Sequence, residues 1–177
     1  MKLIRRILTI AGLLILVAAA ISLLLPGSYR IKSSALIDAP ASLVFQRISD
    51  FQRWKMWNSW DQGNSSAITS NPSSGLDAWR EWKNSPQGYA KATGTYQEGE
   101  REFFYRLLFG DHGVVGIGAF DVQPEGNGTR VSWTFSDKVG MNPIKRWFAL
   151  TYSFKAGEEL DNGLANLKKV CEQARVN

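Results

Sequence analysis

The sequence of 177 residues contains only one cysteine, Cys171, and only one histidine, His112. A single cysteine excludes an internal disulfide, and the apolar neighbours of Cys171 predict an ordinary buried thiol. His112 lies in a turn-like Gly-Asp-His-Gly segment, so the two side chains are not expected to form a nucleophile and base pair. The chain also lacks a recognisable catalytic triad, metal-binding cluster or phosphate-binding loop. We therefore expect no metal and no cofactor.

The chain has no dense block of lysine and arginine beyond its N-terminus. Its formal net charge of +5 falls to +2 when Lys2, Arg5 and Arg6 are set aside. A nucleic-acid-binding protein normally carries a basic face or a recognisable binding motif, and this sequence has neither. We therefore expect no nucleic-acid partner.

What the N-terminus does have is a long apolar run. Residues 7–25 are nineteen consecutive uncharged positions, preceded by three basic residues and followed by Pro26 and Gly27. An α-helix rises about 1.5 Å per residue and the hydrocarbon core of a bilayer is roughly 30 Å thick, so this run just spans it. The basic cluster predicts a single-pass protein with a cytoplasmic N-terminus and a domain on the periplasmic or extracellular side.

A cleavable signal peptide is the alternative interpretation of the same run. Ala18, Ala19 and Ala20 offer small residues at a cleavage site. Ile21 and the leucines at 23–25 continue the apolar run beyond that site, which favours retention as an anchor. The predicted organisation is an anchor over residues 1–27 and one domain over residues 28–177, a length that suits a single core.

The domain is predicted to begin with a strand over residues 29–37. Asp38 and Pro40 then place a capping oxygen and a proline at the start of a helix over residues 41–49. Asp50 is expected to cap a second short helix, which carries Trp54 and Trp57. Turn-rich breaks separate six further predicted strands, near residues 67–71, 78–83, 89–97, 101–109, 114–123 and 129–137.

The chain after Pro143 is predicted to be helical almost to its end, with one apolar stripe that faces the sheet. Such a helix on a sheet gives an α+β domain. In the strand near 114–123, Gly116 and Gly118 remove side-chain volume, which predicts room for a ligand or for a tightly packed helix. The residues on or near the stripe of the helix are Leu150, Phe154, Leu160, Leu164, Leu167, Val170 and Cys171.

The domain carries three recognisable segments: Ile37-Asp38-Ala39-Pro40 with Val44-Phe45, the tryptophans at 54, 57 and 60, and Gly163-Leu164-Ala165-Asn166-Leu167-Lys168. Together they resemble the SRPBCC superfamily, and more narrowly its membrane-anchored polyketide cyclase/dehydrase-like branch. The resemblance implies the helix-grip fold, in which a seven-stranded antiparallel sheet wraps around a long C-terminal helix and leaves a hydrophobic cavity. Members bind lipids, sterols, quinones, hormones or polyketide intermediates, and most need no metal or covalent cofactor.

The favoured hypothesis is a membrane-tethered domain that binds a hydrophobic small molecule, of a lipid, isoprenoid or polyketide-like class. A preformed apolar cleft with a few polar groups is a typical ligand site. The competing interpretation is that the same side chains simply fill the core. The candidate ligand-binding residues are Trp82, Tyr105, Leu107, Phe109, Phe120, Val122, Trp133, Phe135, Leu160 and Leu164.

A second hypothesis is an enzyme that carries out a cyclase or dehydratase step on a hydrophobic substrate. Such an enzyme needs a positioned acid or base whose pKa is shifted by burial. Most of the available polar residues are instead expected on a solvated sheet edge or loop. The candidates are Asp61, Arg80, Glu81, Arg106 and His112.

A third hypothesis is an interaction domain that docks onto another envelope protein. Trp54, Trp57 and Trp60 would form such a surface if their side chains were exposed. If buried, they join the short helices to the sheet. Solvent accessibility of these side chains therefore separates the two interpretations.

Overall fold

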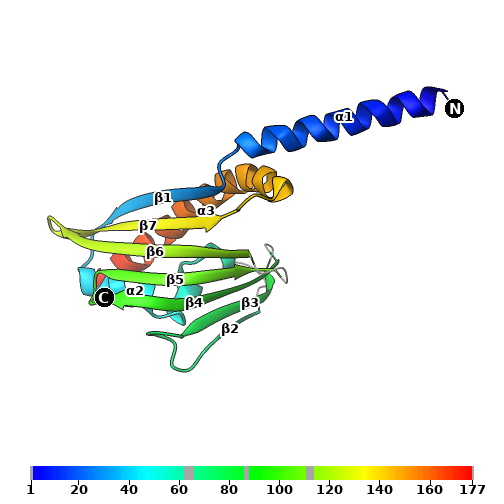
Figure 1. Ribbon diagram of the computed structural model, residues 1–177. Helices are drawn as coiled ribbons and strands as arrows, with labels where there is room; N and C mark the ends of the chain where they lie inside the picture. Colours follow the sequence, from blue (N-terminus) through cyan, green and yellow to red (C-terminus); the bar gives the residue numbers. More distant parts are fainter. Residues whose placement is uncertain (1, 62–65, 86–87, 111–113, 177) are drawn as a thin grey trace.

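A computed structural model describes residues 2–61, 66–85, 88–110 and 114–176, without the side chains of residues 84, 85, 114, 115, 145, 148, 150–154 and 176. The chain forms an N-terminal helix, α1 (Lys2–Leu24), that projects from an α+β domain (Figure 1). In that domain a seven-stranded antiparallel sheet packs against the long C-terminal helix α3 (Pro143–Val176). The predicted helix-grip arrangement is thereby confirmed.

All seven predicted strands are present in the sheet, whose order is β1-β7-β6-β5-β4-β3-β2. The first strand pairs with the last, while the other neighbours in the sheet are consecutive along the chain. Alternate side chains of each strand face the helices, as the period of two requires. The strands are β1 (Ser28–Ile37), β2 (Ala67–Thr69), β3 (Trp79–Ser85), β4 (Gly88–Glu98), β5 (Glu102–Phe109), β6 (Val114–Glu125) and β7 (Gly128–Lys138).

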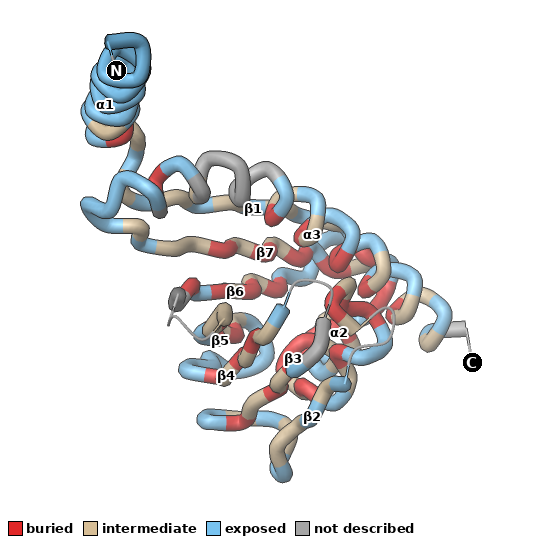
Figure 2. Tube along the Cα trace, turned by 90° about the vertical axis from the view of Figure 1, so that its right-hand side faces the viewer, coloured by how far each residue is buried: buried red, intermediate tan, exposed pale blue. Residues whose placement is uncertain are grey.

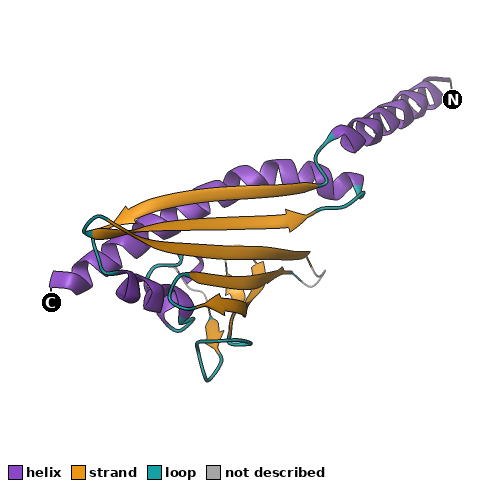
Figure 3. Cartoon of the chain, turned by 60° about the vertical axis from the view of Figure 1, so that its left-hand side comes forward, coloured by secondary structure: helices purple, strands orange, loops and turns teal. Residues whose placement is uncertain are grey.

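The helices of the domain cover one face of the sheet (Figure 3). The first, α2 (Ala41–Ser49), has the predicted bounds. The predicted second helix consists of two separate 3-10 turns, η1 (Arg53–Met56) and η2 (Ser59–Asp61). The Asp50 carboxylate accepts a hydrogen bond from the Gln52 backbone N–H at 2.9 Å, just before the first of these turns.

The predicted cap of α2 by the Asp38 side chain is wrong. Pro40 occupies the N-cap position of this helix, and no side chain caps it. A side-chain oxygen reaches the free N–H groups of the first turn from the N-cap position, and Asp38 lies two residues before it. The Asp38 carboxylate instead pairs with Arg175 near the end of α3, and the Asp38 N–H donates to Glu172 Oε1 at 2.9 Å.

The tryptophans at 54, 57 and 60 are buried, with exposed fractions of 1%, 0% and 6%. The indole N–H groups of Trp54 and Trp57 donate to the carbonyls of Ile48 and Arg47, at 2.7 and 3.0 Å. These carbonyls belong to the last turn of α2, where no helical N–H is available to them. The tryptophans therefore join the short helices to the core beneath the sheet, and they do not form an exposed docking surface.

Candidate functional site

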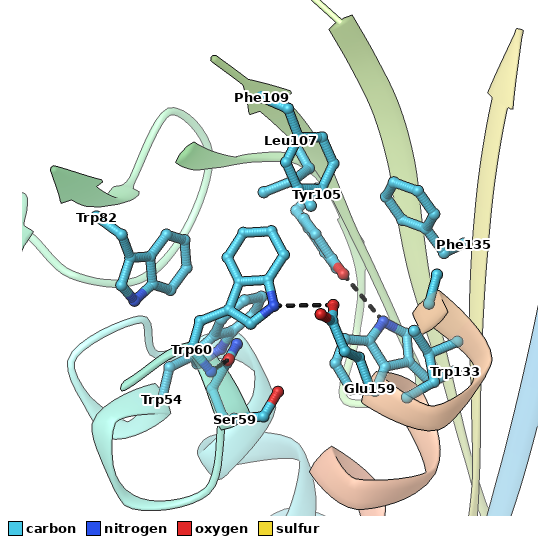
Figure 4. A pocket seen from close by; sticks show the side chains of 13 residues that line it. Trp54, Ser59, Trp60, Trp82, Tyr105, Leu107, Phe109, Trp133, Phe135 and Glu159 are labelled. Carbon is cyan, nitrogen blue, oxygen red and sulfur yellow. Dashed lines mark hydrogen bonds between the residues drawn. The ribbon is translucent and has the colours of Figure 1, made fainter. Parts of the chain in front are cut away.

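A cavity of about 30 Å³ lies between α3 and the concave face of the sheet (Figure 4). Its walls are mostly aromatic and come from β3, β5, β7, the two 3-10 turns and one stretch of α3. The alternation of β5 and β7 turns Tyr105 and Leu107, and Trp133 and Phe135, toward the same space. The lining residues are Trp54, Asn58, Ser59, Trp60, Trp82, Tyr105, Leu107, Phe109, Trp133, Phe135, Ala156, Glu159 and Leu160.

Seven of the ten residues proposed from the sequence line this cavity. The other three, Phe120, Val122 and Leu164, are buried in the adjoining core and are not part of the lining. Ala156, Glu159 and Trp60 were among the lining residues that sequence reasoning missed. For Ala156 and Glu159 the sequence held a usable signal, because residues 156, 159 and 160 follow the spacing of three and four that shares one helical face, and Leu160 was already a candidate.

The glycines of β6 do not provide the predicted room for a ligand or for the helix. A Cβ atom on Gly118 would lie 2.0 Å from the Tyr105 ring, and one on Gly116 would lie 2.1 Å from the Phe135 ring. The two aromatic rings therefore lie across the glycines and occupy the space themselves. The glycines still shape the cavity, because they fix where two rings of its wall can lie.

Two polar groups reach the cavity from opposite walls. The Tyr105 hydroxyl, on β5, accepts a hydrogen bond from Trp133 Nε1 at 3.0 Å. Across from it, the Glu159 carboxylate on α3 accepts one from Trp60 Nε1 at 2.9 Å. Figure 4 shows the carboxylate and the hydroxyl turned toward the same space. Because the Tyr105 oxygen is the acceptor in its bond, its own proton remains to donate.

Burial changes the acidity of both groups. Desolvation raises the pKa of Glu159, against the opposing effects of the Trp60 hydrogen bond and of Lys155. Desolvation also raises the pKa of Tyr105, and the charge of Glu159 adds to that effect. The site therefore presents a phenol O–H donor and a carboxyl group whose pKa lies above its ordinary value.

Asp61 and Arg80 form a buried ion pair, which corrects the expectation of a solvated edge. Arg80 Nη2 and Nε contact the two Asp61 oxygens at 2.5 and 3.0 Å, and the side chains are only 6% and 4% exposed. Trp82 Nε1 also donates to Asp61, at 3.1 Å. The pair joins η2 to β3 and holds the cavity wall that carries Trp60 and Trp82.

Glu81 and Arg106, two of the remaining acid–base candidates, do not reach the cavity. Glu81 and Arg106 alternate with inward residues and so lie on the opposite face of the sheet, where Glu81 accepts a hydrogen bond from the Tyr89 hydroxyl at 3.0 Å. His112 lies outside the described residues. Cys171 is fully buried, and burial raises the pKa of its thiol to about 11. Within the described part of the chain, no three His, Cys, Asp or Glu side chains gather as a metal ion would require.

Comparison with known proteins agrees with this architecture. The family described as "Polyketide cyclase / dehydrase and lipid transport" matches residues 28–172, whereas no curated protein sequence matches the chain. Similar solved structures include the KanY protein, with 23% identity and a TM-score of 0.61 over 83% of this chain and 99% of that chain. They also include the Aha1 dimer from Colwellia psychrerythraea, with 15% identity and a TM-score of 0.60 over 81% of this chain and 96% of that chain.

A protein from Chromobacterium violaceum gives 13% identity and a TM-score of 0.60, over 83% of this chain and 99% of that chain. At such identities these structures show a shared fold. The fold and the family match place the chain in the SRPBCC superfamily. Within it, the chain belongs to the polyketide cyclase/dehydrase and lipid transport family.

Proposed function

We propose that this protein is a membrane-tethered domain that binds a hydrophobic small molecule, of a lipid, isoprenoid or polyketide-like class, in the cavity beneath α3. In this proposal residues 1–27 form a retained anchor with its N-terminus in the cytoplasm, and residues 28–177 lie on the periplasmic or extracellular side. The helix α1 supports the anchor, since it is 23 residues long and contains an 18-residue window with a mean hydropathy of 2.8. It is also exposed along nearly its whole length (Figure 2).

The observation that carries the proposal is the composition of the cavity wall. Aromatic and aliphatic side chains surround two converging polar groups, Tyr105 and Glu159, which is the usual composition of a small-molecule site. The space of about 30 Å³ holds about two water molecules, so a larger ligand requires side chains to move.

The two polar groups define the ligand's polar end. The Tyr105 hydroxyl offers a donor and the Glu159 carboxylate offers an acceptor. A single hydroxyl group satisfies both, and a carbonyl satisfies the first. We therefore propose an apolar molecule that carries one oxygen function at the end nearest α3.

Native mass spectrometry of the full-length protein extracted from membranes tests the proposal. We expect a small molecule to be released on denaturation of the wild-type protein. Y105F removes, and E159Q weakens, one hydrogen bond to the bound molecule. We therefore expect the amount of molecule retained by each variant to fall roughly tenfold. Y96F, at a 49% exposed tyrosine, is the matched control and retains the molecule. Absence of any released molecule from the wild-type protein contradicts the proposal.

A dehydratase step is the second candidate function. The observation that favours it is the raised pKa of Glu159 beside a phenol in a largely apolar cavity, an arrangement suited to general acid–base chemistry. If Glu159 transfers protons, E159Q retains a molecule that differs from the wild-type product by the mass of one water. If the protein only binds, the wild-type protein and E159Q release the same mass.

A further inference from the structure

The anchor helix and the cavity helix are joined through one arginine. Arg146, in the first turn of α3, is only 8% exposed. Its guanidinium donates to the carbonyls of Ser22 and Leu23 at 3.0 and 2.9 Å, and to the Gly140 carbonyl at 2.8 Å. Among the ion pairs of the described residues, none includes Arg146. The cation is therefore stabilised by backbone oxygens, chiefly those at the C-terminal end of α1.

The C-terminal end of α1 is a favourable place for the Arg146 guanidinium. The last carbonyls of a helix have no N–H partner within it, and the helix dipole favours a positive charge there. The linker is held as well, since the Gly27 carbonyl accepts hydrogen bonds from the N–H groups of Val139 and Gly140 at 2.9 and 3.1 Å. A Cβ atom on Gly27 would lie only 3.2 Å from Arg146 Nη2. The anchor thus meets the domain in a defined geometry.

Exposed apolar side chains gather at this junction. Met141, just before α3, and Ile144 and Trp147, near its start, are spaced three apart and are 73%, 66% and 41% exposed. Trp147 Nε1 lies 3.4 Å from the carbonyl of Ala18, within α1. We call these three residues the junction patch. Tryptophan is enriched where protein meets the polar boundary of a bilayer, and a grouped apolar surface marks an interaction site.

The cavity lies at the same end of the sheet. β1 begins at Ser28, directly after the anchor, and Ser28 pairs with Lys138 at the end of β7. Phe135, a cavity residue, is three positions before Lys138, a distance of roughly 10 Å along a strand. Phe109, another cavity residue, is the last residue of β5 and pairs with the first residue of β6. The cavity is therefore at the anchor end of the domain.

We infer that the junction patch lies in the polar boundary of the bilayer that α1 crosses, so that the cavity draws its ligand from the adjacent lipid leaflet. This inference rests on the proposed membrane tether. The bilayer suits the patch better than a protein partner does, because the patch is continuous with an apolar helix long enough to span a membrane. Exposed Arg30 and Lys138, at the same end of the sheet, add positive charge that lipid phosphates would neutralise.

Spin labels on the full-length protein in lipid nanodiscs test the inference. Single cysteines at positions 141 and 144 are labelled, and their accessibility to oxygen and to a water-soluble nickel chelate is measured. Native Cys171 is buried, so the unsubstituted protein serves as the control for its labelling. Labels at Ile117 and Leu76, which are 53% and 66% exposed elsewhere, are matched apolar controls, and a label at Leu14 reports on the span.

We expect the labels at positions 141 and 144 to favour oxygen over the nickel chelate, as the Leu14 label does, while the Ile117 and Leu76 labels favour the chelate. Chelate access at 141 and 144 equal to that of the controls overturns the inference while the tether stands. Protection of both labels from both reagents assigns the patch to a second protein copy and also overturns it. Chelate access at Leu14 removes the tether itself, and the inference with it.

Discussion

The interface between α3 and the sheet has two halves that differ in packing. In the C-terminal half, Leu164, Leu167 and Cys171 are at most 2% exposed, and the Lys168 ammonium group donates to the Leu36 carbonyl at 2.9 Å. In the half nearer the anchor, α3 presents Ala156, which is too small to fill the space beside it, and the cavity results. The comparison shows that α3 is fixed by its packed half, while the cavity lies in the half nearer α1.

The ion pair of the cavity wall gives the largest expected effect. D61A leaves the guanidinium of Arg80 buried without its carboxylate partner. We expect the free energy of unfolding to fall by about 3–5 kcal/mol. Thermal or chemical unfolding of the full-length protein in detergent measures the change. E125A breaks the exposed Glu125–Arg130 pair and is the control. Equal effects of the two substitutions contradict the structural role of the buried pair.

A pair of leucine truncations compares the two halves directly. L167A removes side-chain volume from the packed half and is expected to cost about 2–5 kcal/mol of unfolding free energy. L160A makes the same change at a side chain that already borders the cavity and is 5% exposed, and it is expected to cost less. Denaturant titration of both variants measures the difference. A loss for L160A as large as that for L167A would mean that the cavity half is packed as tightly as the other.

Substitutions at the two glycines of α3 are expected to change stability by smaller amounts and in opposite directions. A Cβ atom on Gly163 would lie 2.6 Å from the Trp133 ring, so G163A is expected to cost about 1–3 kcal/mol by overpacking. A Cβ atom on Gly157 meets nothing closer than an Ile31 methyl group at 3.9 Å. G157A is therefore expected to stabilise the helix by up to about 1 kcal/mol. Melting temperatures that shift in the same direction would contradict this assignment.

The smallest expected effect is the pH dependence that Glu159 contributes. Its pKa is higher in the folded chain than the value of 4.5 expected for an exposed glutamate, so the folded state binds this proton more tightly. Its stabilising contribution is complete below pH 4.5 and is lost as the pH rises through the raised folded pKa. E159Q should therefore gain stability relative to the wild-type protein as the pH rises from 4.5 through the raised folded pKa. A constant difference across this range contradicts the shifted pKa.

Much of the fold is predictable from the sequence because local patterns determine it. The alternation of Val131, Trp133 and Phe135 predicts the inward face of β7, and Pro40 predicts the start of α2. The same reasoning failed at Asp38, whose side chain is used by Arg175, 137 residues away in sequence. Long-range ion pairs leave no local pattern, which also explains why the burial of Asp61 with Arg80 was not expected.

The candidate site was predictable in its apolar part only. Tyr105, Leu107, Trp133 and Phe135 follow from strand alternation. Glu159 was missed because a charged residue beside an apolar stripe is normally solvated, whereas here the Trp60 indole and the small Ala156 allow it to be half-buried. The cavity volume depends on the positions of the Tyr105 and Phe135 rings over Gly118 and Gly116. The spacing of residues in the sequence does not specify these ring positions.

The most direct test of the central claim is to fill the cavity from α3. A156L places a larger side chain into a space of about 30 Å³, while A165L makes the same change at an exposed position of the same helix. The quantity of small molecule released from each purified full-length protein is measured by mass spectrometry, with the melting temperature as a check on folding. We expect A165L to match the wild-type protein and folded A156L to release none. Equal release from both variants would contradict a ligand site between α3 and the sheet.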